Sequence, residues 1–134
     1  MTGRSSPSSE HLAEMSRRAW AVRGQARVHG KTLVGCAVLS EAGEVFVGCN
    51  IEHRFRSHDI HAEVAALSGL VSAGGTTVAA VLIAAERENF TPCGACLDWI
   101  MELGGPDCWV VCEKTQGGLE ATYTASELMP HYPY

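Results

Sequence analysis

The chain lacks three features that would assign it to common functional classes. It has no apolar run approaching the roughly 20 residues of a membrane-spanning helix. Basic residues are few, because 10 Lys and Arg stand against 15 Asp and Glu, for a formal net charge of −5. Polynucleotide affinity rests mainly on neutralising phosphates with Lys and Arg, so this balance argues against a nucleic-acid binder. Aromatic residues make up only 7% and are not interleaved with basic ones as on base-stacking surfaces.

The N-terminus lacks the apolar stretch of a secretory signal, since residues 1–9 are polar and contain Gly, Ser and Pro. We therefore expect a cytoplasmic protein with reduced thiols. At 134 residues the chain is long enough for one domain with a real core. We expect a disordered tail over residues 1–8 and a single domain over residues 9–134.

The pattern of apolar residues predicts alternating helices and strands. A helix is expected from Ser9 to about Val28, where apolar residues recur at helical spacing. The further elements expected are strands over 32–39 and 44–49 joined as a hairpin, a loop over 50–60, a helix over 62–73, a strand over 78–85, a helix over 92–103 with Pro92 at its first position, strands over 108–113 and 119–124, and a short C-terminal turn. This order predicts a mixed sheet covered by helices.

Two short segments carry residues suited to a metal site. Cys93 and Cys96 are spaced i, i+3 at the start of a predicted helix, where free backbone N–H groups favour thiolates. His61 opens the other apolar helix, about thirty residues earlier. One imidazole and two thiolates leave a fourth position for water, which is typical of a catalytic zinc site. We therefore interpret the six cysteines as two ligands and four buried small side chains.

Glu63 lies two residues after His61, close enough to serve the metal centre without ligating it. A carboxylate there is a candidate for moving protons during hydrolysis. Other readings of C-x-x-C are a structural zinc site or a redox pair. A structural site needs a fourth ligand, and no second C-x-x-C exists. The remaining candidates for a fourth ligand are His29, His53 and His58.

These segments resemble the cytidine deaminase superfamily, and within it the small free-nucleoside deaminases. H-x-E followed by P-C-x-x-C is the signature of zinc-dependent nucleobase deaminases. The matching segments are Val34–Leu39, Gly48–Glu52, His61–Glu63 and Pro92–Cys96. The resemblance implies a three-layer α/β/α sandwich around a five-stranded mixed sheet, one Zn²⁺ per chain, and a role in nucleotide salvage. It also implies a homotetramer, or a dimer, with active sites near the subunit interfaces.

The resemblance also assigns residues to the substrate. Asn50 and Glu52 correspond to the family residues that hold the ribose, and Ala62 belongs to the substrate pocket. Further candidate contacts are His53, Arg54 and Phe90. Blasticidin S deaminases are similar in fold and carry a His like His53, but they lack an acid corresponding to Glu52. A cationic antibiotic would also be an unusual ligand beside Arg54 and Arg56.

Several positions depart from the family pattern, including His53 in place of Asn and Leu97-Asp98 in place of Arg-Gln. Short members usually have Cys where this chain has His61 and Arg where it has Val64. The two changes agree, because three thiolates leave zinc with a negative charge that Arg offsets, whereas one His and two thiolates leave it neutral. A family Phe near the base is replaced by Thr32.

The sequence therefore predicts zinc-dependent hydrolytic deamination of cytidine, deoxycytidine or a closely related aminopyrimidine nucleoside. The alternatives are deamination of a different or modified amino-heterocycle, and a zinc-stabilised assembly protein without activity. Glu63 favours an enzyme, because a structural metal needs no acid at that position.

Overall fold

The protein alternates helices and strands along most of its length. The structure, a computed structural model, describes residues 5–133. Its elements are α1 (Ser9–Arg23), β1 (Gly35–Ser40), β2 (Val45–Cys49), η1 (Arg56–His58), α2 (Ala62–Ser72), β3 (Val78–Ala84), α3 (Gly94–Gly104), β4 (Trp109–Thr115), β5 (Gly118–Thr124) and α4 (Ala125–Leu128). Part of the tail expected over residues 1–8, namely residues 1–4, lies outside the described residues. Of the rest, Ser8 caps α1 by accepting a hydrogen bond from the His11 amide.

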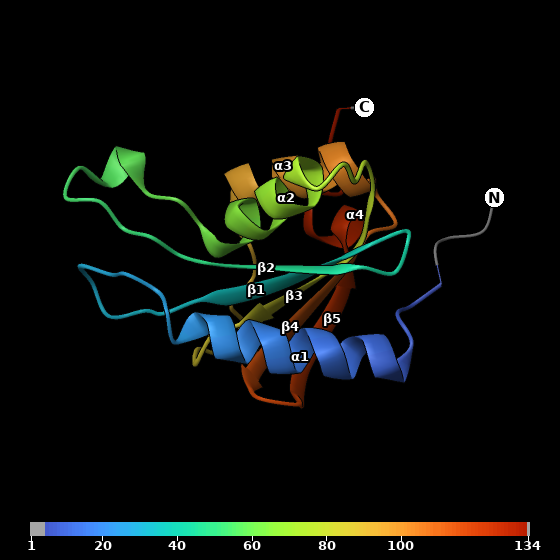
Figure 1. Cartoon of the computed structure of the whole chain (residues 1–134). Coiled ribbons are helices and arrows are strands. Elements are labelled where there is room, and N and C mark those ends of the chain that lie inside the picture. Colours follow the sequence, from blue (N-terminus) through green and yellow to red (C-terminus); the bar gives the residue numbers. More distant parts are fainter. Residues whose placement is uncertain (1–4, 134) are drawn as a thin grey trace.

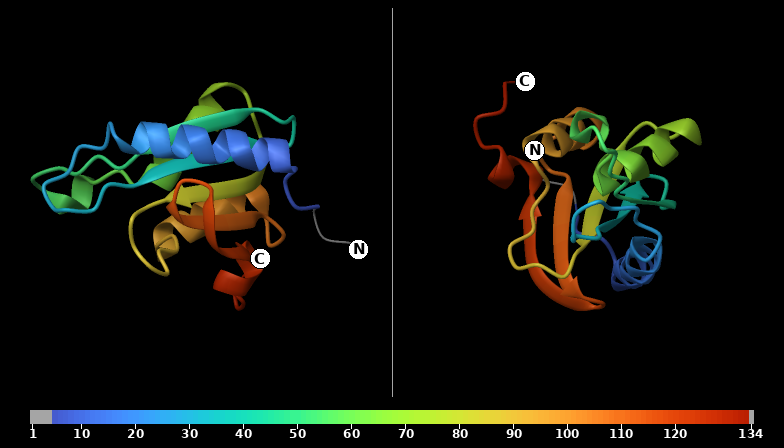
Figure 2. Two further views of the ribbon diagram at one scale, coloured as in Figure 1. Left: turned by 90° about the horizontal axis from the view of Figure 1, so that it is seen from below. Right: turned by 90° about the vertical axis from the view of Figure 1, so that its left-hand side faces the viewer.

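The five strands form one mixed sheet in the order β2-β1-β3-β4-β5. Neighbouring strands run antiparallel except β3 and β4, which are parallel. Helix α1 covers one face of the sheet, and α2, α3 and α4 cover the other (Figures 1 and 2). The predicted α/β/α sandwich with a five-stranded mixed sheet is confirmed. No helix within residues 5–133 has the length and apolar character to cross a membrane.

Apolar side chains fill the space on both faces of the sheet. Alternate residues of β1 face opposite layers, with Cys36 and Val38 on the side of α2 and α3 and Ala37 and Leu39 on the side of α1. Strand β3 follows the same pattern over a continuous apolar run. Strands covered on both faces have this composition, so β1 and β3 form a rigid centre on which the helices are seated.

Two glycines allow helices to approach the sheet closely. A Cβ atom at Gly48 would lie 2.5 Å from the Ala66 nitrogen and 2.6 Å from the Ala65 Cβ atom of α2. At Gly35, on β1, a Cβ atom would overlap the Ala19 carbonyl oxygen of α1. Gly35 and Gly48, which belong to two of the four matching segments, therefore set the distance between the sheet and the helices α1 and α2.

The first helix is shorter than predicted. It ends at Arg23 rather than near Val28. The reason is tertiary, because the Arg27 amide donates to the Asn50 carbonyl at 3.1 Å and the Glu52 amide donates to the Arg27 carbonyl at 2.7 Å. A chain that pairs with an extended segment in this way cannot continue its own helical hydrogen bonds.

The third helix also begins later than predicted. Pro92 was expected at its first position, but α3 begins at Gly94 and Cys93 is the N-cap residue. Cys93 has extended backbone angles, φ −71° and ψ 171°. The shift matters because it places a predicted metal ligand at the helix terminus rather than within its first turn.

Two connecting segments project together from one end of the sheet, and we call them the arm (residues 24–34 and 50–60). They lie side by side in Figure 1 and in the left view of Figure 2. Isolated backbone bridges join Arg27 to Ile51 and Ile51 to Ile60. The arm borders the N-terminus of α2, so its conformation shapes the entrance to the site described next.

Candidate active site

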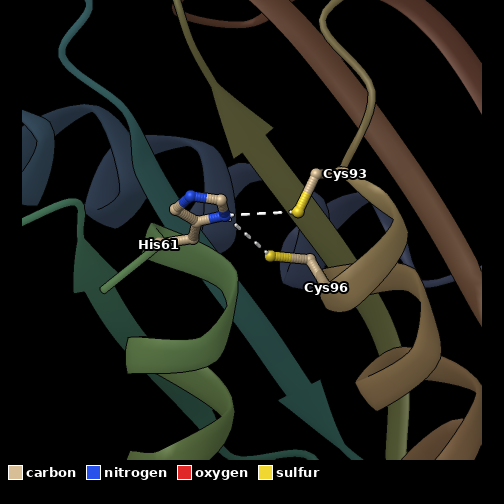
Figure 3. Close-up of side chains that lie close together, drawn as sticks. All are labelled: His61, Cys93 and Cys96. Atoms are coloured by element: carbon tan, nitrogen blue, oxygen red, sulfur yellow. Dashed lines mark hydrogen bonds between the residues drawn. The ribbon is translucent and has the colours of Figure 1, made fainter. Parts of the chain in front are cut away.

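Two helix N-termini bring the three predicted metal ligands together (Figure 3). His61 is the N-cap residue of α2, Cys93 is the N-cap residue of α3, and Cys96 lies in the first turn of α3. Neither N-cap side chain makes a capping hydrogen bond, so both are available to a ligand. Helix N-termini carry partial positive charge and favour thiolates over thiols.

The spacing of the three ligand atoms fits a zinc ion. His61 Nδ1 lies 3.3 Å from Cys93 Sγ and 3.4 Å from Cys96 Sγ. Zinc bonds of about 2.0–2.1 Å to nitrogen and about 2.3 Å to sulfur in a tetrahedron put the nitrogen and sulfur about 3.6 Å apart. The three donor atoms lie within 4.8 Å of one another and form the one such cluster found within residues 5–133. His29, His53 and His58 are not part of it, which leaves the fourth position open.

The three ligands differ in their access to solvent. His61 and Cys93 are exposed and Cys96 is buried. Burial raises the pKa of the Cys96 thiol, and the nearby Glu63 and Cys93 raise it further. A metal ion at the site reverses this tendency, because a coordinating thiol is deprotonated outright.

Glu63 is buried beside this cluster, with only 4% of its surface exposed. Burial raises the pKa of its carboxyl group above the ordinary value. Its own backbone N–H, His61 and Cys96 act in the opposite direction. A buried carboxyl group with a raised pKa next to a metal site is suited to accepting and releasing protons during hydrolysis.

A cavity of about 340 Å³ opens over the cluster, a size suited to a small organic ligand. Of the substrate residues expected from the resemblance, Asn50, Glu52, Ala62 and Phe90 line it, together with Glu63, His61 and Cys93. His53 and Arg54 do not line this cavity, and they border a neighbouring one with His29 and His58. These two candidates therefore do not reach the reaction centre within this chain.

Asn50 joins the two segments of the arm to each other. Its side-chain oxygen accepts a hydrogen bond from the Val34 amide at 2.9 Å, and its side-chain nitrogen donates to the Thr32 carbonyl at 3.0 Å. An amide side chain has two donors and two acceptor positions, so half of this capacity remains for a ligand.

Glu52 also joins the two segments of the arm, through its carboxylate group. One carboxylate oxygen accepts hydrogen bonds from the His29 and Gly30 amides at 2.7 and 2.8 Å. The other pairs with Arg56 at 3.0 Å. The backbone N–H of Gly30 is the main reason why the pKa of Glu52 is lowered. A carboxylate has about four acceptor positions, which leaves one for a ligand.

The cavity is also lined by residues that the sequence analysis did not assign to the site: Thr32 (noted only as a departure from the family), Val34, Asp59, Ile60, Arg87 and Thr91. Arg56, noted there only as a cation near a ligand, lines the cavity as well. Arg56 contacts Asp59 at 2.8 Å in addition to Glu52, so two carboxylates share one guanidinium. The signal for this trio was present in the sequence as acids at i−4 and i+3 from Arg56. Arg87 lies between β3 and the Pro92–Cys96 motif and carried no such signal.

Comparison with known proteins agrees with this geometry. A family model described as the cytidine and deoxycytidylate deaminase zinc-binding region matches residues 9–112. The chain belongs to the cytidine and deoxycytidylate deaminase family. It is accordingly a hydrolytic deaminase with a zinc-binding domain, and the prediction of this enzyme class and of zinc as its cofactor is confirmed.

Individual relatives cover most of the chain. A cytidine deaminase of Sporosarcina psychrophila is 36% identical over 90% of this chain and 88% of the relative. The crystal structure of cytidine deaminase from Burkholderia pseudomallei is 32% identical with a TM-score of 0.82, covering 93% of this chain and 98% of that one. Cytidine deaminase from Mycobacterium leprae is 26% identical with a TM-score of 0.76, covering 88% and 96%.

Proposed function

We propose that this enzyme removes the amino group of cytidine or deoxycytidine by hydrolysis, producing uridine or deoxyuridine and ammonia. The observation that carries this proposal is the buried carboxyl group of Glu63 beside the His61–Cys93–Cys96 cluster at a ligand-sized cavity. The relatives reported above, which are named cytidine deaminases, support this choice of substrate. The uridine or deoxyuridine produced would enter nucleotide salvage.

His61, Cys93 and Cys96 would hold the zinc ion. When bound by three protein ligands, zinc activates a water molecule as a nucleophile near neutral pH. The two thiolates cancel the two positive charges of the zinc ion and the imidazole is neutral, so the centre has no net charge and needs no neighbouring cation. Val64, at the position where short family members carry Arg, borders an apolar groove with Leu67 and Trp99. That surrounding agrees with a centre that needs no counterion.

Glu63 would move the protons of the reaction. The hydrolysis needs one proton on the pyrimidine ring nitrogen and another on the departing amino group. Both protons come from water, so a single carboxyl group can accept and deliver them without net change. Burial raises the pKa of Glu63 and so favours its protonated form, which can deliver a proton as well as be regenerated by accepting one.

Asn50 and Glu52 would contact the sugar, with Ala62 and Phe90 near the base. Each of the first two has acceptor or donor capacity left after its bonds within the arm. Their bonds to Val34, His29 and Gly30 keep both side chains in place before a ligand arrives. Such preorganisation lowers the entropy cost of binding.

We also propose a homotetramer with active sites near the subunit interfaces. Exposed apolar side chains support it, because they lie in the arm and along a groove formed by α2 and α3. Phe55 and Ile60 in the arm are 62% and 43% exposed, and Val71 and Trp99 are 50% and 52% exposed. Light scattering coupled to size exclusion would give the oligomeric state, and a monomer at micromolar concentration would refute this part.

The function is tested with zinc-loaded protein and a panel of amino-heterocycles that includes cytidine, deoxycytidine and cytosine. Ammonia release and the mass change from amino to oxo identify the substrate. Glu63→Gln should keep the zinc and the fold yet lose about 10²–10⁴-fold in rate. The matched control is Glu102→Gln, on the exposed side of α3. Absence of turnover on both nucleosides, or retention of more than a tenth of the rate by Glu63→Gln, would refute the proposal.

A further inference from the structure

The charged residues that line the catalytic cavity are unequally paired. They are Glu52, Arg56, Asp59, Glu63 and Arg87. Arg56 contacts both Glu52 and Asp59. Two carboxylates thus share one guanidinium, and the side of the cavity formed by these three residues keeps one negative charge in excess. Arg87 has no carboxylate within ion-pair distance in the part of the chain that the structure describes. The cavity thus contains one guanidinium whose charge the fold does not neutralise.

The acidic neighbours of Arg87 are engaged elsewhere. Glu86 pairs with Arg23 of α1 at 2.6 Å, and Glu88 pairs with Lys114 of β4 at 3.2 Å. Both carboxylates flank Arg87 in sequence and would be its nearest counterions in a flexible loop. Their pairing with other cations keeps them away from the guanidinium.

The position of Arg87 at the cavity is defined by hydrogen bonds. Its Nη1 atom donates to the Thr32 hydroxyl at 3.1 Å. The Thr32 carbonyl in turn accepts from Asn50 at 3.0 Å, which connects the guanidinium to the predicted sugar residues. The loop is shaped by Asn89, which has φ 51° and whose amide donates to Glu120 at 3.1 Å. Four of the five guanidinium N–H groups remain available.

We propose that Arg87 binds an anionic group on the substrate, a phosphate monoester or a carboxylate attached to the sugar. This inference rests on the proposed function, because the base must occupy the zinc end for the substituent to reach Arg87. Guanidinium binds planar or tetrahedral oxyanions through two parallel hydrogen bonds. The excess negative charge near Arg56 repels an anion from the other wall and directs it toward Arg87. Thr32, in place of a bulky aromatic residue, leaves room beside the guanidinium.

The experiment measures binding and selectivity in the zinc-loaded protein. Calorimetry compares uridine, uridine 5′-monophosphate and uridine 5′-carboxylate, and kinetics compare cytidine with cytidine 5′-monophosphate. We expect at least one anionic product to bind about 10- to 100-fold more tightly than uridine, and Arg87→Gln to remove that preference. The preference should also weaken with added salt. Which anion is preferred identifies the phosphate or the carboxylate as the recognised group.

Arg17→Gln is the matched control, because Arg17 is exposed on α1, at the opposite face of the sheet, and the substitution makes the same change in net charge. It should leave the ratio of anionic to neutral affinity within twofold of wild type. Anionic products that bind no more tightly than uridine would overturn the inference, as would equal effects of the two variants. If cytidine is deaminated without anion preference, only this inference fails. If no nucleoside binds or reacts, the proposed function fails with it.

Discussion

Substitution of Gly48 by alanine tests whether close packing of α2 on β2 positions the reaction centre. The new Cβ atom would lie 2.5 Å from the Ala66 nitrogen and 2.6 Å from the Ala65 Cβ atom. Apolar carbon atoms in contact prefer about 3.5–4.0 Å, so α2 must move away from the sheet by about 1 Å. Overpacking of this kind costs about 1–3 kcal/mol in the free energy of unfolding. A domain with the usual 5–15 kcal/mol stays folded after such a loss.

The activity of this variant should fall much more than its folded fraction. Helix α2 carries His61 at its N-cap and Glu63 in its first turn, whereas Cys93 and Cys96 are on α3. A shift of α2 by about 1 Å therefore changes the distances between ligands that come from different helices. Misplacement by this amount can reduce catalysis about 100-fold. We expect weaker zinc binding together with a comparable loss in kcat/KM on cytidine.

Gly69→Ala is the matched control in the same helix. Its new Cβ atom would lie 3.8 Å from the Phe46 Cβ atom, which is an ordinary contact. Alanine is preferred over glycine inside helices by about 0.5–1 kcal/mol, so this variant should be as stable as wild type or slightly more stable. Chemical denaturation, elemental analysis for zinc and steady-state kinetics are measured on both variants. Equal stability and activity of the two would refute the reasoning.

Three further predictions concern the metal, the arm and the sugar. Cys93→Ala should lose the bound zinc and unfold at lower denaturant concentration, since metal-binding free energy contributes to folding; elemental analysis showing retained zinc would contradict this. The His53 amide lowers the pKa of Asp59, and Arg56 lowers it further. The ionised carboxylate therefore stabilises this part of the arm above pH ~4, and the contribution is lost as the pH falls through the lowered pKa. Hydrogen-exchange protection of the His53 amide should decrease over that pH range in the wild type but not in Asp59→Asn. Glu52→Ala should reduce kcat/KM on cytidine roughly 10- to 150-fold and on cytosine much less, whereas equal losses with zinc retained would assign Glu52 to the arm alone.

Local sequence signals were sufficient for the central elements. The apolar run of β3 and the apolar helix α2 were predicted within a residue or two at each end, because β3 and the inner face of α2 are buried and their composition reflects that burial. The cluster of His61, Cys93 and Cys96 could also be predicted, since i, i+3 spacing and adjacent helix starts are properties of short segments.

Features that depend on contacts between distant segments could not be predicted. The early end of α1 results from pairing of Arg27 with Asn50 and Glu52, more than twenty residues away. The position of Arg87 results from a hydrogen bond to Thr32, fifty-five residues earlier in the chain. The position of Arg54 at the neighbouring cavity depends on how the segments of the arm pair, which no periodicity in the segment indicates.

The unequal burial of the three metal ligands implies a route and an order for zinc exchange. His61 and Cys93 are exposed while Cys96 is buried against the core, so a chelator can reach the first two without opening the sheet. An incoming ion meets these outer ligands before the inner thiolate, and a departing ion leaves them last. Because β1 and β3 are buried by apolar side chains on both faces independently of the metal, the scaffold can persist while the ion is exchanged. Zinc supply could then set how much of the enzyme is active without first setting how much of it is folded.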